Sequence, residues 1–490
     1  MGLAHRRRML VLAICCTSLL IVTLDNTVLN VALPTLQREF DASVSGMQWT
    51  VDAYTLVLAS LLMLAGSTAD RIGRRKIFVA GLMIFTLGSV LCSLAPSLEL
   101  LVVFRMVQAV GGSMLNPVAM SIITNTFTDP RERARAIGVW GGVAGISLAA
   151  GPLVGGVLVD SVGWRSIFLV NLPVGLAALF LTLRYVPESR APKPRRADPV
   201  GQLLVIVLLG ALTYAIIEAP RAGWTSPLIL GFAGTAALGL AGLLRYEPRR
   251  AEPLIDLRFF RSAPFSGATV IAVCAFAALS GFLFLSTLYL QDVLGLDALH
   301  AGLWMLPIAA MALVCGPLSG RLVGGRGPRI PLLIAGVTMT ASGVLFAAFD
   351  AAASDGTRLI GYVLFGLGFG FVNAPITNTA VSGMPRAQAG VAAAVASTSR
   401  QIGTTLGVAV IGAVLASGVA SSSYAKYAED FTPASRPGWW IIAGCGLAVL
   451  VLGVVTSGRW ARETARRTAE RLTTEADEHA TPPPPVTNDR

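Results

Sequence analysis

Asp25 lies in the apolar stretch from about Met9 to Val31, where a proton-exchanging side chain is unusual. A carboxylate within hydrocarbon is costly, so an acid at such a position is by default a candidate proton or ion site. Asn26 follows it directly, and Asn30 lies one helical turn beyond Asn26, which gives one helical face a polar cluster. This pattern favours reversible protonation of Asp25. The alternative is a carboxylate that only caps a helix or snorkels to the outer membrane surface.

Two arginines also fall within apolar segments. Arg105 lies at a depth similar to that of Asp25, as judged from a rise of about 1.5 Å per helical residue. We expect the two to face one cavity, because a nearby guanidinium favours a charged carboxylate whereas desolvation favours a neutral one. The alternative for Arg105 is a structural ion pair or a carbonyl cap. Arg400 stands near the membrane midplane, where it needs a partner or water, and with Gln401 and Gln108 it joins Asn26 and Asn30 as a candidate for the substrate cavity.

The composition indicates a membrane protein. Of 490 residues, 54% are hydrophobic and 13% charged, and the mean hydropathy is +0.69. The net charge of +11 would suggest a nucleic-acid partner in a soluble protein, but membrane proteins collect basic residues on their cytoplasmic side. The three histidines and six cysteines have no metal-binding spacing, and no lysine follows a Gly-rich phosphate loop. We therefore predict no metal, no cofactor, no nucleic-acid partner and no enzymatic activity.

Fourteen segments reach the length of about 20 apolar residues that a membrane-spanning helix needs. Their expected limits are 9–31, 50–69, 77–95, 100–124, 136–159, 166–185, 200–219, 226–246, 263–290, 299–322, 330–349, 358–381, 389–417 and 437–457. With a cytoplasmic N-terminus, 30 of the 38 Lys and Arg lie inside, six lie outside and two lie within spans. This asymmetry orients the chain, and the even number of spans makes both termini cytoplasmic.

An internal repeat divides these spans. The links GSTADRIGRRK at 66–76 and GRLVGGRGPR at 320–329 both have glycine at their first and eighth positions. Each follows the second span of a six-span block, an organisation typical of one transporter architecture. We therefore predict an all-α membrane protein with two pseudo-symmetric six-helix bundles and two inserted helices. Its expected divisions are an N-terminal bundle (1–186), the two additional helices with their linkers (187–262), a C-terminal bundle (263–457) and a cytoplasmic, largely disordered tail (458–490). We expect this tail to begin as a short frayed helix after the last span and to be disordered beyond it.

Three motifs resemble signatures of the major facilitator superfamily, and specifically of its fourteen-span drug:proton antiporter branch of EmrB/QacA type. They are GSTADRIGRRK between spans 2 and 3, LVVFRMVQAVGGS in span 4 and GISLAAGPLVGG in span 5. The branch is indicated by LDNTVLNVALP in span 1, WRSIFLVNLPVG at span 6 and STSRQIGTTLG in span 13. The resemblance extends along nearly the whole membrane region.

This resemblance implies a proton-coupled exporter that works by alternating access, with Asp25 and Arg105 in proton coupling. It also implies a conformational latch between the halves, in the loop that carries Gly66, Asp70, Arg71, Gly73 and Arg74. The alternative for this loop is plain positive-inside anchoring. The resemblance further implies a leak-proof contact between the halves, formed by Gly145, Gly151, Pro152, Gly155 and Gly156. The alternative for these residues is a generic glycine-rich packing seam.

The expected substrates are amphipathic or aromatic compounds such as an antibiotic, biocide or dye, because apolar walls with isolated polar groups suit them. Export of an endogenous metabolite or lipid, and proton symport of a nutrient, remain as alternatives. We expect a monomer in the cell membrane, and the excess of 35 arginines over three lysines indicates a GC-rich bacterial genome. Asp52, Glu218 and Asp292 fall near outer ends of spans and are expected to be mostly solvated, with Asp52 open as a second titratable group.

Overall fold

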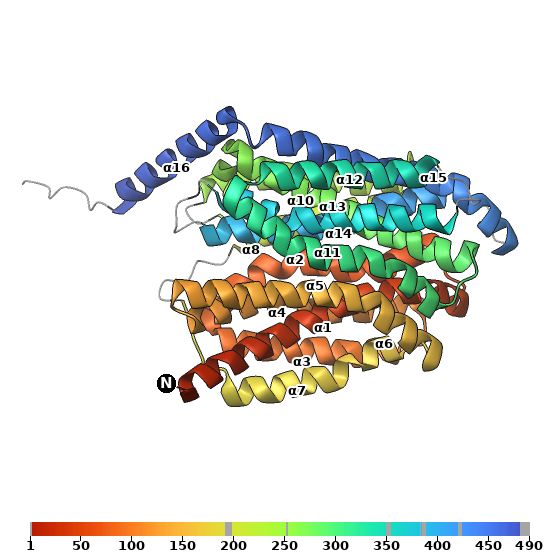
Figure 1. The fold of residues 1–490 in the computed structure, drawn as a ribbon, viewed down its shortest axis with the longest axis horizontal. Helices are drawn as coiled ribbons and strands as arrows, with labels where there is room; N and C mark the ends of the chain where they lie inside the picture. Colours follow the sequence, from red (N-terminus) through yellow and green to blue (C-terminus); the bar gives the residue numbers. More distant parts are fainter. Residues whose placement is uncertain are drawn as a thin grey trace, which may run out of the picture.

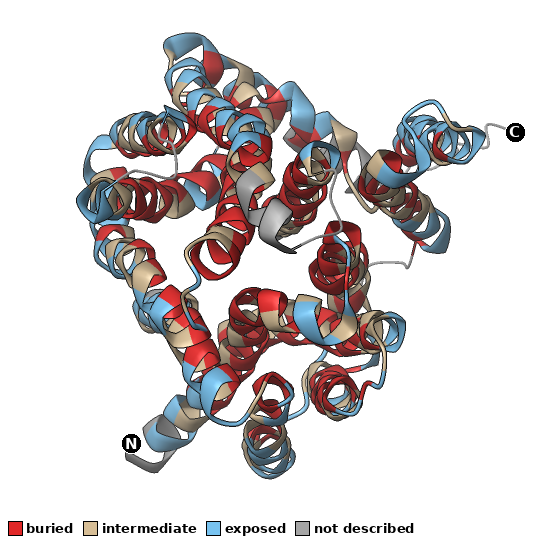
Figure 2. Cartoon of the chain, turned by 90° about the vertical axis from the view of Figure 1, so that its right-hand side faces the viewer, coloured by how far each residue is buried: buried red, intermediate tan, exposed pale blue. Residues whose placement is uncertain are grey.

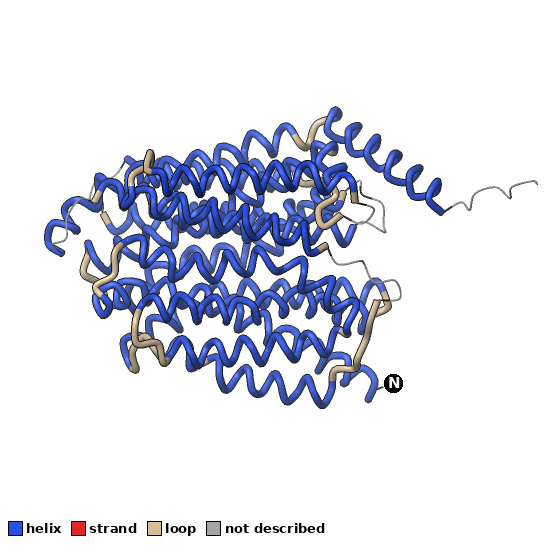
Figure 3. Tube along the Cα trace, turned by 180° about the vertical axis from the view of Figure 1, so that it is seen from behind, coloured by secondary structure: helices blue, strands red, loops and turns tan. Residues whose placement is uncertain are grey.

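The computed structural model describes residues 2–191, 198–250, 253–348, 354–382, 384, 389–419 and 424–480. The regular elements in these ranges are helices, which run side by side along the long axis of the molecule (Figures 1 and 3). Their connections gather at the two ends of this bundle. The N-terminus and the last helix lie at the same end, as expected for an even number of spans.

Among the described residues, fourteen helical stretches are long and apolar enough to cross a membrane, which confirms the predicted number. They are formed by α1 (Gly2–Phe40), α2 (Val44–Ile72), α3 (Arg74–Ser93), α4 (Leu98–Thr126), α5 (Pro130–Ser161), α6 with α7 (Ser166–Leu169 and Asn171–Tyr185), α8 (Pro199–Ala222), α9 (Pro227–Tyr246), α10 with the π turn η3 (Ala263–Leu288 and Tyr289–Val293), α11 (Ala298–Arg326), α12 (Arg329–Ala348), α13 (Asp355–Val381), α14 (Ala389–Gly418) and α15 (Tyr424–Val455).

Several helices extend beyond their predicted limits. The apolar window marks only the part that crosses hydrocarbon, whereas the backbone hydrogen bonds continue into the polar flanks. α1 therefore starts before and ends after the expected 9–31, and α15 begins well before 437. Capping side chains fix other helix starts: Ser43 accepts from the N–H of Gly46 at 3.2 Å, and Asp129 precedes Pro130 at the start of α5.

The helices form two groups. In the first, α3 packs against α4 and α7, and α1 packs against α5; in the second, α12 packs against α15, and α10 against α14. The two groups lie on either side of the molecule's long axis (Figure 1). The inserted helices α8 and α9 pack against each other, and α8 also packs against α2 and α14. Viewed along the helices, buried residues face the interior and exposed ones face outward (Figure 2).

The repeated links end their preceding helices in the same way. Gly73 follows α2 with a φ of 134°, and Gly327 follows α11 with a φ of 80°. In each case the glycine N–H donates to the carbonyl four residues earlier, Ala69 or Val323, at 3.0 Å. A side chain at either position would be strained, because positive φ favours glycine. The sequence repeat is therefore also a structural repeat.

The tail begins with α16 (Arg459–Ala480), which is longer than the short frayed helix expected there. This stretch is rich in helix-forming Ala, Arg and Glu. Arg466 pairs with Glu470 one turn later at 2.8 Å. Leu472 is buried on a helix that packs against α10 and the 3₁₀ helix η2 (Leu257–Arg261). Residues 481–490 lie outside the described residues.

Candidate functional site

The site is built around the carboxylate of Asp25, which is 3% exposed in the middle of α1. Arg105 of α4 donates from Nη1 to Asp25 Oδ2 at 2.5 Å and forms a fully buried ion pair. The other carboxylate oxygen, Oδ1, accepts from Gln108 Nε2 and from Asn171 Nδ2, each at 2.8 Å. The carboxylate is thus held by one cation and two amides, as a buried charge requires.

A second layer of polar groups supports these partners. The Ser89 hydroxyl of α3 accepts from Gln108 at 2.8 Å and from Asn171 at 3.3 Å. Gln108 Oε1 in turn accepts from Arg105 Nη1 at 2.7 Å. The Arg105 guanidinium lies 4.1 Å from the ring centroid of Tyr54, whose π face stabilises the cation. The network therefore joins α1, α2, α3, α4 and α7 without solvent-exposed members.

The local sequence explains how these groups meet. Arg105 and Gln108 are three residues apart on α4, so they share a helix face. Asn171 starts α7 directly after the short helix α6, where the broken span turns its side chain toward α1. Asp25 and Arg105 were predicted to lie at one depth and face one cavity; they lie in direct contact as a buried ion pair, which was the alternative for Arg105. Whether the pair couples transport to protons is taken up below as a proposal.

Three members of the network were missed from the sequence: Tyr54, Ser89 and Asn171. They come from three other spans, and a depth estimate along one helix says nothing about which faces of other helices point inward. Asn171 carried a usable signal, since it is an amide within the apolar motif WRSIFLVNLPVG. Ser89 carried a weaker one, because serine is common within spanning helices.

Gln108 was predicted for the substrate cavity and lies instead within the Asp25 network in this structure, so its role in a cavity stays a prediction. Its side chain is fully buried, and both ends are engaged by Arg105, Asp25 and Ser89. The physical reason is its position one turn from Arg105 on the face that points into the first helix group. Asn26, also predicted there, is half-buried, and its carbonyl accepts from Asn30 at 3.0 Å.

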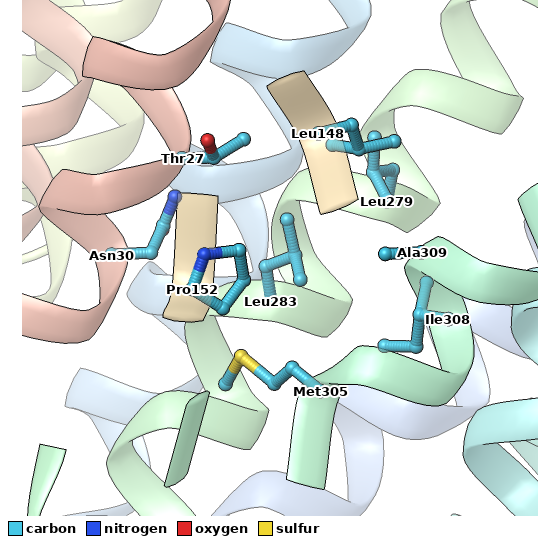
Figure 4. Close-up of a pocket in the computed structure, with 9 residues that line it drawn as sticks. All are labelled: Thr27, Asn30, Leu148, Pro152, Leu279, Leu283, Met305, Ile308 and Ala309. Carbon is cyan, nitrogen blue, oxygen red and sulfur yellow. The ribbon is translucent and has the colours of Figure 1, made fainter. Parts of the chain in front are cut away.

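Asn30 lines a narrow cavity between the two helix groups (Figure 4). It lies near Thr27 of the same helix, and the remaining walls are apolar. These walls come from α5, α10 and α11 and consist of Leu148, Pro152, Leu279, Leu283, Met305, Ile308 and Ala309. The cavity combines hydrophobic walls with two polar groups, and its volume of about 10 Å³ is enough for a single water molecule in this outward-closed state.

The glycine-rich part of α5 lies between α1 and α11. A methyl group on Gly155 would lie 3.0 Å from the carbonyl of Val28 on α1, and Gly151 packs against Thr27. On the other side, a methyl group on Gly156 would lie 2.6 Å from Leu299 Cα on α11. The absence of side chains lets the three backbones approach closely.

Two further members of this segment also contact α11. The carbonyl of Pro152 packs against Gly302, and a methyl group on Gly145 would lie 3.6 Å from Leu313. In contrast, methyl groups on Gly138, Gly141 and Gly142 would meet nothing within 4 Å. The contact between α5 and α11 therefore closes the end of the molecule away from the termini and is lost toward the other end.

Hydrogen bonds tie the two groups together at this same end. Gln48 of α2 donates to the carbonyls of Val408 and Ala409 on α14 at 3.1 and 2.9 Å. The N–H of Leu299 donates to Asp160 of α5 at 2.7 Å. The basic-residue pattern assigns this end to the outside, so the structure is closed outward.

The loop between α2 and α3 makes its hydrogen bonds within the first group. Asp70 accepts from Arg74 at 3.0 Å and from the backbone N–H of Ala191, after α7. The N–H of Arg75 donates to Glu188 at 3.1 Å. These described contacts run to the segment after α7, so the predicted contact across the halves is not seen at Asp70 in this outward-closed state. The latch remains a prediction.

Arg400 was expected to need a partner near the midplane. Its Nη2 donates to the Thr377 hydroxyl of α13 at 2.5 Å, and its guanidinium lies 5.9 Å from the ring centroid of Phe276 on α10. Among the described residues, its partners are thus a neutral hydroxyl and an aromatic ring within the second group. The neighbouring Gln401 is half-buried. A role of either residue in the substrate cavity stays a prediction.

Two of the outer acids are buried, contrary to the expectation that they would be solvated. Asp52 is fully buried because α14 covers the outer half of α2, where Thr405 donates to Thr55 at 3.0 Å. Asp292 is buried in the π turn after α10, next to Gln291, which donates across the groups to a carbonyl of α1 at 2.8 Å. Glu218 is half-buried and accepts from a tryptophan of α2 at 2.8 Å.

Residues 15–408 match the model of the Major Facilitator Superfamily. The chain is 42% identical over 412 residues to the "Multidrug resistance protein Stp" of Mycobacterium tuberculosis, covering 84% of this chain and 76% of that protein. It is 37% identical over 420 residues to the "Tetracenomycin C resistance and export protein" of Streptomyces glaucescens, covering 85% and 78%. It is 35% identical over 409 residues to the "Multidrug efflux pump LfrA" of Mycolicibacterium smegmatis, covering 83% and 81%.

Solved structures share the fold at low sequence identity. A bacterial homolog of the human lysosomal transporter Spinster, in an inward-facing conformation, matches with a TM-score of 0.64 at 18% identity, covering 95% of this chain and 98% of that chain. A structure described as giving insights into proton dependent oligopeptide transporters matches with a TM-score of 0.64 at 13% identity, covering 94% and 100%. These matches support the arrangement of the helices.

Removal of Arg105 tests the energetic coupling of the buried pair. Arg105→Ala leaves the Asp25 carboxylate without its cation, so we expect the free energy of unfolding to fall by about 3–5 kcal/mol. The double variant Asp25→Asn/Arg105→Ala should lose less than the sum of the single losses, because no unpaired carboxylate remains. Thermal and denaturant unfolding of the four purified proteins measures this cycle. Additive losses would contradict the coupling.

Gly156→Ala tests the seam between α5 and α11. The added methyl group meets Leu299 backbone, so we expect the outward-closed state to become less populated. Cysteines placed at Asp160 and Leu299 should then cross-link several-fold less than in the same background without the alanine. Gly234→Ala on α9 is the matched control, since its methyl group meets nothing within 4 Å. Equal cross-linking in all three proteins would argue against the seam.

Proposed function

The chain belongs to the Major Facilitator Superfamily, and we propose that it is a proton-coupled exporter of amphipathic or aromatic compounds that works by alternating access. It is a multi-pass membrane protein with a small-molecule substrate and a lipid environment, like its bacterial relatives. The observation that carries proton coupling is the buried carboxylate of Asp25, held by Arg105 and two amides.

Proton binding and ion pairing compete at Asp25. A carboxylate accepts from Arg105, Gln108 and Asn171, whereas a protonated carboxyl group loses the charge that holds the guanidinium. Protonation therefore weakens the contact between α1 and α4. Loss of the proton restores that contact, which closes the site again. We propose that this exchange sets the position of α1 within the first helix group.

The close packing of α1, α5 and α11 supports a route from the acid to the rest of the protein. Thr27 and Val28, which follow Asp25 by less than one turn, pack against Gly151 and Gly155 of α5. The opposite side of α5 packs against α11 through Gly156. A shift of α1 thus displaces α5 directly, and α5 in turn contacts α11 of the other half.

Export of foreign compounds is favoured over the alternatives by two observations. The narrow cavity at Asn30 is mostly apolar. The relatives with 35–42% identity are named for multidrug resistance, drug efflux or antibiotic export. Export of an endogenous metabolite or lipid would use the same apolar surface. Nutrient symport would need more hydrogen-bonding groups across the cavity.

We further propose how the parts divide this work. The bundles over 1–186 and 263–457 are the rocking units, and residues 187–262 form the inserted pair between them. The protein acts as a monomer and performs no covalent chemistry. The α2–α3 loop with Asp70 latches the halves when the cytoplasmic side closes, a state opposite to the one described here.

Asp25→Asn removes the titratable group while keeping a similar shape. We expect proton flux driven by candidate antibiotics or dyes to be lost in inverted membrane vesicles, as read by a pH-sensitive quenched dye. Asp355→Asn is the control, because its carboxylate is exposed at the start of α13 and pairs with Arg358. Substrate-driven proton flux that persists in well-inserted Asp25→Asn protein would rule out the coupling role.

Asp70→Ala removes the carboxylate that accepts from Arg74 and keeps the backbone carbonyl that accepts from Ala191. We expect transport rates to change several-fold while the amount of protein in the membrane stays close to normal, because the loop acts in switching between states. Rates in vesicles and immunoblots of the membrane fraction measure the two effects. A fall in abundance with an unchanged rate per molecule would favour plain anchoring.

A further inference from the structure

A second buried acidic site lies where the inserted helices join the rest of the chain. Asp198 precedes α8 and caps it, accepting from the N–H of Gly201 at 2.9 Å. Glu247 follows α9 in the 3₁₀ turn η1 (Glu247–Arg249). The basic-residue pattern places both residues at the cytoplasmic end. Neither takes part in the Asp25 network.

The two carboxyl groups face one small space. A methyl group on Gly201 would lie 2.5 Å from Glu247 Oε1 and 2.8 Å from Asp198 Oδ2, so both oxygens crowd the same point. Glu247 is 1% exposed and Asp198 is 4% exposed. The missing side chain of Gly201 provides the room that this pair occupies.

The two facing oxygens are the ones without hydrogen-bond partners. Glu247 Oε1 and Asp198 Oδ2 accept no hydrogen bond from the described residues, although both are buried. The other oxygens are engaged: Asp198 Oδ1 also accepts from the Tyr246 hydroxyl at 3.2 Å, and Glu247 Oε2 accepts from the N–H of Ile255 at 3.4 Å. The two unsatisfied acceptors therefore both border the space beside Gly201.

The surrounding charge is insufficient for two carboxylates. Among the described residues, the ion pair at this site is with Arg250, whose Nε lies 3.9 Å from Asp198 Oδ2 and whose side chain is over a third exposed. One partly solvated cation leaves a buried negative charge uncompensated. Two carboxylates at such a site are stabilised when one proton is shared between them.

We propose that Asp198 and Glu247 form a second proton-binding site, in which one proton bridges Glu247 Oε1 and Asp198 Oδ2. The bridge joins the start of α8 to the segment that leads from α9 into the second helix group, since Glu247 also holds Ile255. Loss of the proton leaves two negative charges facing each other and loosens this joint. The site thus makes the attachment of the inserted helices sensitive to cytoplasmic pH.

Infrared difference spectra of the purified full-length protein, recorded between acidic and alkaline pH, test the site. We expect a C=O band of a protonated carboxyl group that disappears at alkaline pH. Glu247→Gln and Asp198→Asn should each remove this band, whereas Asp25→Asn should retain it. A band that survives in both Glu247→Gln and Asp198→Asn would overturn the proposal. This readout needs no transport, so it stands apart from the exporter function.

Thermal unfolding gives a second readout. A proton bound in the folded state stabilises it at low pH, so the melting temperature of the natural protein should fall as pH rises from about 5 to about 9. Glu247→Gln keeps a hydrogen-bonding side chain without the titration and should flatten this dependence. Asp256→Asn is the matched control, because Asp256 lies nearby but already accepts from the Arg258 guanidinium at 2.8 and 2.9 Å.

Two outcomes of this measurement would count against the shared proton. An equal pH dependence in Glu247→Gln, Asp256→Asn and the natural protein would show that the pair does not titrate. The second outcome is a rise in melting temperature at alkaline pH that occurs with only one of the two salts, sodium chloride or potassium chloride. If Glu247→Gln abolishes this rise, the site binds a metal cation in place of a proton.

Discussion

The buried ion pair between Asp25 and Arg105 is the contact around which the first helix group is organised. A charge removed from water must be compensated where it lies, and the compensation here comes from α4 and α7 directly, from Ser89 of α3 behind them and from the ring of Tyr54. These helices therefore hold fixed positions around α1. Both members of the pair are fully buried, which sets it apart from the partly exposed ion pairs Arg8–Glu132, Arg74–Asp70 and Arg165–Glu39.

Close packing connects the surroundings of this ion pair to the second helix group. Glycines on α5 bring its backbone against α1 on one side and α11 on the other, so α5 has little freedom to move alone. The same helix loses contact with α11 toward the cytoplasmic end, where Gly141 and Gly142 face open space. A segment packed at one end and free at the other suits a pivot, because rotation about the packed end changes access without breaking the fold.

The sequence predicted the features that depend on one helix at a time. Hydropathy located the fourteen spans, and the helical rise placed Asp25 and Arg105 at the same depth in the membrane. It failed where several helices decide the outcome. Asp52 was taken as solvated because the cover by α14 comes from the other half of the chain. The place of Gln108 in the Asp25 network could not be read from the sequence, because the inward face of α4 was unknown. The helix α16 is longer than the sequence predicted.

The inserted helices make the two sides of the molecule unequal. α8 packs against α2 and α14, so it shields one of the two places where the halves meet, whereas the described contacts of α5 and α11 include no such shield. The bilayer therefore borders the junction of the halves directly along α5 and α11, whereas α8 stands between the lipid and the junction of α2 and α14. The lipid environment of the two junctions is thus unequal in this fourteen-helix arrangement.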